Sequence, residues 1–155
     1  MQAVERIVSQ LNYTYRGPSW HGPTLMELLA DVTEEEAGKI VFMNVHSIWE
    51  IVQHAAAWKR AVIRRLDGDK AELQGEEDWP PVVDPNSRAW RDALAELDAA
   101  HAALESRVRQ MTENDLDRNA PGQDMTFYRT VHGIMEHDAY HAGQIALLKK
   151  TLRIA

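Results

Sequence analysis

The sequence contains no cysteine, has more acidic than basic residues and lacks long apolar runs. Without cysteine the chain has no disulfide, thiolate ligand or cysteine nucleophile, so a metal site must use histidine or carboxylate. The net charge of −7 argues against a nucleic acid partner, because phosphate binding needs a basic surface. No apolar run approaches the ~18 residues of a membrane span, and the N-terminus lacks the pattern of a signal peptide. We therefore expect a cytoplasmic protein that binds neither nucleic acid nor membrane.

The composition is that of an ordinary globular protein. The chain has 155 residues, of which 45% are hydrophobic and 26% are charged. This length is sufficient to bury a substantial hydrophobic core. We expect residues 1–155 to form a single domain.

Four long segments place apolar residues at alternating steps of three and four, which is typical of amphipathic helices. They cover residues 2–15, 47–67, 87–111 and 126–152. Capping patterns predict shorter helical turns after Thr24, after Thr33 and after Thr112. No segment alternates as a strand does, and residues 68–86 are rich in glycine, proline and acidic residues. The pattern predicts an all-α four-helix bundle with a long crossover between its second and third long helices.

The last long segment carries polar residues within its apolar stripe. The stripe consists of Phe127, Val131, Ile134, Asp138, His141, Ile145, Leu148 and Leu152. His137 precedes His141 by one helical turn, so the two imidazoles project side by side. Burial without partners would cost about 1–3 kcal/mol for each polar group. Either histidine alone favours a hydrogen-bonded core residue or a stripe edge that reaches water, whereas the pair beside a carboxylate favours a metal site.

His54 is the best third partner for His137 and His141. It is the only other histidine in the middle of a helix at the rim of an apolar stripe, where a bundle can leave a pocket open. Three imidazoles are able to hold one divalent ion at ~2.0–2.1 Å and leave a position free for water or substrate. Trp58 lies one turn after His54, where it either packs in the core or lines the pocket.

The other four histidines favour structural roles. His101 occupies a stripe position, so we expect a buried, hydrogen-bonded side chain, with a supporting role near a metal as the alternative. His46 precedes a helix cap and should help to close that end. His21 lies in a glycine-proline turn, where it is expected to pack against Trp20. His132 falls half a turn from the stripe and should be exposed.

Residues 137–141, HDAYH, also invite comparison with the H-E-x-x-H motif of zinc proteases. Here the acid is Asp138, which is one methylene shorter than glutamate, and no histidine or acid follows His141. The protease interpretation therefore fails for lack of a third ligand. Asp138 is left with two alternatives, orienting a ligand imidazole or orienting a bound water, and no catalytic residue is assigned.

The motifs resemble those of the DinB-like (DinB/YfiT-like) family of metalloenzymes. Residues 47–58, SIWEIVQHAAAW, look like the family's second-helix histidine segment. Residues 137–145, HDAYHAGQI, are similar to its closing H-x-x-x-H-x-G-Q-I motif, and residues 20–25, WHGPTL, look like the entry segment of one branch. The resemblance implies an up-down-down-up bundle, often a homodimer, with nickel or zinc on His54, His137 and His141. It also implies, for some members, a low-molecular-weight thiol such as mycothiol or bacillithiol.

Two functions from different classes remain open. The first is a metalloenzyme in which the ion activates a thiol or water for transfer or hydrolysis on a small molecule. The second is a non-enzymatic, stress-associated dimeric bundle that holds metal incidentally. DNA binding, suggested by the family's damage-inducible name, ranks last because the chain is acidic.

Overall fold

The computed structural model describes residues 3–154, and every regular element within them is helical. The long helices are α1 (Ala3–Arg16), α4 (Ile48–Leu66), α5 (Ser87–Arg109) and α7 (Phe127–Ile154). The short ones are α2 (Leu25–Leu29), α3 (Glu34–Gly38), the 3₁₀ turn η1 (Gly75–Glu77) and α6 (Glu113–Leu116). Between residues 3 and 154 there is no strand, and a single isolated bridge joins Asn119 to Thr126. The prediction of an all-α protein is confirmed.

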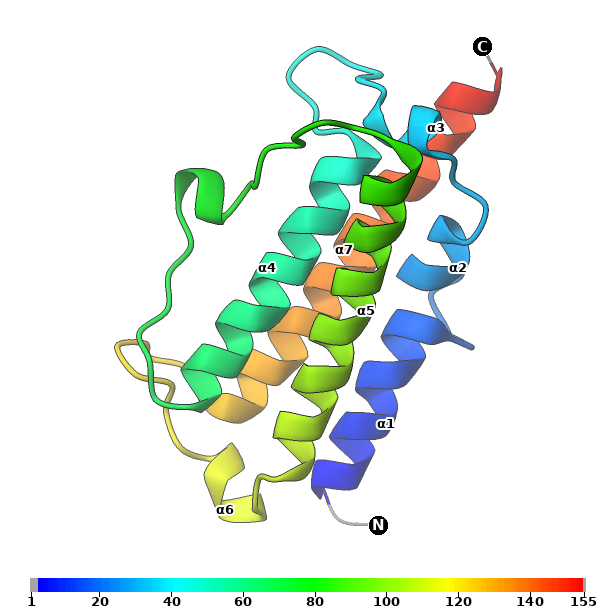
Figure 1. The fold of residues 1–155 in the computed structure, drawn as a ribbon. Helices are drawn as coiled ribbons and strands as arrows, with labels where there is room; N and C mark the ends of the chain where they lie inside the picture. The colour runs from blue at the N-terminus through cyan, green and yellow to red at the C-terminus, as the bar shows by residue number, and fades with distance from the viewer. Residues whose placement is uncertain (1–2, 155) are drawn as a thin grey trace.

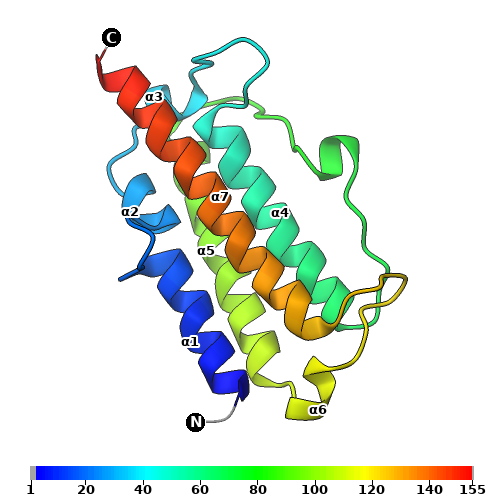
Figure 2. The same cartoon turned by 180° about the vertical axis from the view of Figure 1, so that it is seen from behind.

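The four long helices lie side by side (Figures 1 and 2). α1 and α7 run in one direction, and α4 and α5 run in the other. α4 packs against both α5 and α7, while α1 packs against the other edges of α5 and α7. The segment between α4 and α5 returns along the outside of the molecule, as its length predicts, and η1 lies within it (Figure 1). None of the helices in residues 3–154 is long and apolar enough to cross a membrane.

Capping boxes define where four of the helices begin. In each box the side-chain oxygen of a serine or threonine accepts a hydrogen bond from the backbone N–H of the residue three positions later. The carboxylate of that later residue accepts a hydrogen bond from the backbone N–H of the serine or threonine. The pairs are Thr24 with Glu27, Thr33 with Glu36, Ser47 with Glu50, and Thr112 with Asp115. Each cap contributes about 1 kcal/mol. The Ser47 box is the one that determines the start of α4, which carries His54.

A polar layer separates two apolar clusters in the core. Lys59 on α4 and Asp138 on α7 form an ion pair within it, and neither side chain is exposed to solvent. The Lys59 ammonium also lies 4.8 Å from the centroid of the Tyr15 ring, and the His101 imidazole stacks on that ring at 3.7 Å. His101 donates a hydrogen bond through Nε2 to Asn12 Oδ1 at 3.2 Å. The prediction that His101 is a buried, hydrogen-bonded core residue is confirmed.

Candidate metal centre

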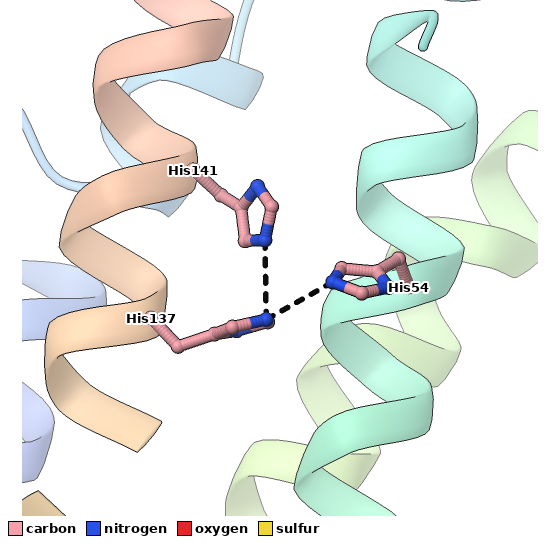
Figure 3. Close-up of side chains that lie close together, drawn as sticks. All are labelled: His54, His137 and His141. Carbon is pink, nitrogen blue, oxygen red and sulfur yellow. Dashed lines mark hydrogen bonds between the residues drawn. The ribbon is translucent and has the colours of Figure 1, made fainter. Parts of the chain in front are cut away.

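Three imidazoles meet between α4 and α7 (Figure 3). His137 and His141 project from α7, and His54 projects toward them from α4. The Nε2 atom of His137 lies 3.0 Å from Nε2 of His54 and 3.1 Å from Nε2 of His141. Ligands at 2.0–2.1 Å in a tetrahedral arrangement would be about 3.3 Å apart. Both distances are close to this value, and all three nitrogens lie within 4.8 Å of one another, so they could share one divalent ion.

The hydrogen bonds at the outer edges of two rings determine their tautomers. His54 donates through Nδ1 to the backbone carbonyl of Asp78 at 2.7 Å. His141 donates through Nδ1 to the side-chain oxygen of Gln144 at 2.6 Å. A neutral imidazole has one N–H, so Nε2 of both rings carries a lone pair directed at His137.

His137 cannot satisfy both lone pairs. It has at most one N–H at Nε2, whereas two acceptors face that atom, and its buried Nδ1 has no hydrogen-bond partner among the described residues. A cation between the three Nε2 atoms would satisfy all of them at once. The residues present therefore fit a divalent metal ion, and His54, His137 and His141 are the side chains that could hold it.

Burial lowers the pKa of all three imidazoles. The pKa of His137 falls to about 3, mainly through desolvation and secondarily through the neighbouring imidazoles of His141 and His54. Desolvation lowers the pKa of His141 to about 4. Desolvation also lowers the pKa of His54, although the carbonyl and carboxylate of Asp78 oppose the shift. All three rings are therefore neutral at pH 7, the form that coordinates metal.

The crossover segment supports His54 from outside the helices. Asp78 accepts from Trp58 Nε1 at 2.7 Å through Oδ1, and the same oxygen lies 3.2 Å from Nδ1 of His54. The Trp79 ring stacks on His54 at 3.8 Å, and the His46 ring stacks on Trp79 at 3.5 Å. These contacts fix the plane of the His54 ring and exclude water from one of its faces. Such partners commonly orient metal-ligating imidazoles.

Two cavities reach the triad through different histidines. A cavity of about 220 Å³ has His137 and Trp58 in its wall, together with apolar side chains of α4 and α7. A second, of about 230 Å³, has His141 and Gln144 in its wall, with Trp79, His46 and Tyr140. The site is thus accessible to a small molecule, although His54 and His141 are buried and His137 is partly buried.

Among the described residues Asp138 makes no hydrogen bond to any of the three imidazoles, and its orienting a bound water stays a prediction. Its carboxylate is fully buried and pairs with Lys59 in the core. Successive residues of a helix are 100° apart, so Asp138 faces the protein core while His137 faces the rim of the interface between α4 and α7. Asp138 therefore stabilises the contact of α4 with α7 and does not contribute to the cluster of imidazoles.

The remaining histidines lie away from the cluster or at its edge. His46 packs at the start of α4, 3.5 Å from Glu50, as expected, and its ring also reaches the second cavity. His21 and Trp20 are both exposed, so the turn buries neither ring. His132, expected to be exposed, is half-buried because the Tyr128 ring lies 4.3 Å away.

Sequence reasoning missed four residues around the triad. Lys59 occupies a position in the apolar stripe of α4, but apolar periodicity gives no signal at a charged residue. Gln144 lies three residues after His141, and this helical spacing was a usable signal. Asp78 and Trp79 lie in the crossover more than twenty residues after His54, and no periodicity places such residues. Trp58 was assigned two alternatives, and it both lines a cavity and donates to Asp78.

The fold and the site thus define an all-helical protein with a buried three-histidine cluster able to hold a metal ion. Comparison with family models adds a match to the DinB superfamily over residues 10–145, which is most of the chain. The chain belongs to the DinB superfamily. Comparison with curated proteins and with solved structures gave no match.

Proposed function

We propose that this protein is a metal-dependent enzyme acting on a small molecule. A divalent ion, nickel or zinc, would be held by His54, His137 and His141. Such an ion lowers the pKa of a thiol or water in its open position and so supplies a nucleophile for transfer or hydrolysis. The observation that carries the proposal is the convergence of three neutral imidazole nitrogens, whose lone pairs the N–H groups of the described residues cannot all satisfy.

The chain's own residues prepare the site for this chemistry. Asp78 and Gln144 hold the outer nitrogens of His54 and His141 and so direct their lone pairs inward. Burial keeps the rings deprotonated, so metal does not compete with protons at neutral pH. Among the described residues, Asp78 accepts from Trp58 and Asp138 pairs with Lys59, so neither carboxylate is a free general base. The nucleophile would therefore depend on activation by the ion.

The remaining features of the proposal concern assembly and location. We propose an up-down-down-up four-helix bundle, and the helix directions in Figures 1 and 2 support this arrangement. We also propose a single cytoplasmic domain that forms a homodimer. Exposed apolar side chains between α3 and α4, namely Ile40, Phe42, Met43 and Val45, support a surface that associates. The acidic charge supports a small molecule, and not nucleic acid or membrane, as the partner.

Metal content tests the proposal directly. Protein purified without chelator should contain about one nickel or zinc ion per chain by elemental analysis, and His137→Ala should reduce this strongly because one of three ligands is lost. His132→Ala is the matched control, since that histidine lies on the same helix outside the cluster and should leave metal content unchanged. Near-zero metal in both the parent protein and His137→Ala, even after incubation with zinc or nickel, would end the metalloenzyme hypothesis.

A second function remains open because neither Asp78 nor Asp138 is a free general base in the described part of the chain. The protein would then be a non-enzymatic, stress-associated dimer in which metal is incidental. A screen of thiols with small electrophiles separates the two, using the metal-loaded protein. Turnover that disappears in His54→Ala would exclude the non-enzymatic function, whereas dimerisation by light scattering without any turnover would favour it.

A further inference from the structure

The cavity that begins at His137 is apolar over most of its wall but carries one cation. It is about 220 Å³ in volume, and its wall includes Trp58, Val62, Arg65, Met125, Ile134 and His137. Val62 and Ile134 are buried side chains of α4 and α7, so the inner end of the cavity is built from the helix interface. A neutral apolar cavity would need no explanation, whereas a guanidinium in its wall does.

Arg65 is held in place without a carboxylate partner. Its Nε donates to the backbone carbonyl of Ala71 at 2.8 Å, and its guanidinium carbon lies 5.2 Å from the centroid of the Trp58 ring. No acid lies within ion-pair distance of it in residues 3–154, and Glu72 attracts it only from farther away. Its neighbour Arg64, by contrast, pairs with Asp69 at 2.7 Å on the surface. Arg65 therefore presents terminal N–H groups that no side chain of the described chain satisfies.

The geometry points to the substrate class of the site: a small, apolar carboxylate. We propose that its carboxylate binds the guanidinium of Arg65, that its apolar body lies against Trp58 and Ile134, and that its other end reaches His137. This inference rests on the proposed function, since His137 is one of the three candidate ligands. Arginine is suited to this role because its planar fork binds carboxylate through two parallel hydrogen bonds.

Trp58 connects the two ends of the cavity. Its ring lies under the Arg65 guanidinium, and its centroid is 6.1 Å from that of the His137 ring. The hydrogen bond from Trp58 to Asp78 fixes the indole at this position. An apolar cavity of ~150 Å³ holds benzene, so the larger volume here suits a single ring bearing a short acidic side chain. Phenylacetate matches this description, and phenylacetamide is its neutral counterpart.

The test compares the two compounds as probes in NMR titrations of the protein, both metal-loaded and after removal of metal. We expect phenylacetate to bind at least about tenfold more tightly than phenylacetamide in both forms, since a hydrogen-bonded charge pair contributes at least this much. Arg65→Gln should abolish the preference, and Arg64→Gln, the matched control, should retain it. Equal binding of the two compounds, or a preference that survives Arg65→Gln, would overturn the inference.

A steric pair of variants locates the ligand independently of charge. Gly133 lies in the wall of the same cavity, and Gly143 lies ten residues further along α7, outside it; a Cβ at either position meets nothing within 4 Å. Gly133→Leu should weaken phenylacetate binding several-fold, and Gly143→Leu should not. Equal effects of the two variants would contradict the assigned position.

The outcomes also separate this inference from the proposed function. A carboxylate preference that appears only with metal and survives Arg65→Gln would mean that the carboxylate binds the ion, which overturns the inference and leaves the metal function standing. A preference that depends on Arg65 in a protein that takes up no metal would support the cavity assignment and refute the metal function.

Discussion

The buried ion pair of Lys59 with Asp138 offers the sharpest test of the structure. Both side chains are fully buried, and the second carboxylate oxygen of Asp138 has no hydrogen-bond partner in the described part of the chain. Burial raises the pKa of Asp138, and the Lys59 ammonium opposes that shift. Each charge thus depends on the other, since an isolated ion in the core would have lost its hydration without compensation.

Removal of one partner should therefore cost far more than removal of both. Lys59→Met or Asp138→Leu alone leaves an uncompensated group in the core, and we expect each to lower the free energy of unfolding by about 3–5 kcal/mol. The double variant replaces the pair with apolar side chains of similar size. Its free energy of unfolding should lie within about 1 kcal/mol of the parent or exceed it.

Urea unfolding monitored by circular dichroism at helical wavelengths measures these differences. The control is the exposed pair of Arg88 with Asp92, 3.8 Å apart on α5, whose removal should change stability by less than about 0.5 kcal/mol. If a single variant does not fold, the double variant still tests the argument. Additive losses of several kcal/mol in the double variant, or single losses below about 1 kcal/mol, would refute the reasoning.

The same double variant tests the position assigned to Asp138. Because its carboxylate faces the core and not the imidazoles, the variant should still bind one metal ion per chain at saturating zinc. Loss of metal from a well-folded double variant would restore the interpretation in which Asp138 orients a ligand.

Two further predictions concern stability. In the unfolded chain the histidine pKa is near 6.5, whereas in the folded protein it is about 3 for His137 and about 4 for His141. Each ring therefore contributes stability that is complete above pH ~6.5. This contribution is lost as the pH falls toward the folded pKa, because the unfolded chain then binds protons that the folded protein does not. The metal-free protein should lose about 1.4 kcal/mol per pH unit for each of these rings between pH ~6 and ~4, measured by urea midpoints; a flat profile would contradict this. Gly143→Ala should raise the free energy of unfolding by about 0.5–1 kcal/mol, because the site is helical, exposed and free of steric conflict. Thermal unfolding measures this change, and a lower melting temperature for the variant would contradict the prediction.

Much of the secondary structure was predictable because local chemistry decides it. Ser47 and Glu50 satisfy one another's backbone groups at a helix start, and this arrangement depends on four consecutive residues. Long helices are likewise predicted by the spacing of their apolar residues. The predicted and observed bounds of α4 and α7 consequently differ by no more than two residues at either end.

The candidate site was predictable only where it lies on helices. His137 and His141 share a face of α7, and His54 lies at the rim of α4, so spacing alone selected all three. The environment of His54 depends on Asp78, which reaches it from the crossover, and chain folding over such a distance leaves no periodic trace in the sequence. Lys59 was missed for a different reason, since it occupies an apolar position with a charge whose partner is 79 residues away.

Polar residues specify how α4 and α7 meet. Apolar side chains recur along both helices at the same steps, so hydrophobic packing alone tolerates a slide of one turn, about 5.4 Å. Such a slide would leave Lys59 and Asp138 buried without partners, and it would separate His54 from the two imidazoles of α7. The ion pair on the inner side and the imidazoles on the rim therefore favour the same register. The buried ion pair thus helps to keep the three imidazole nitrogens together, because it disfavours the other registers.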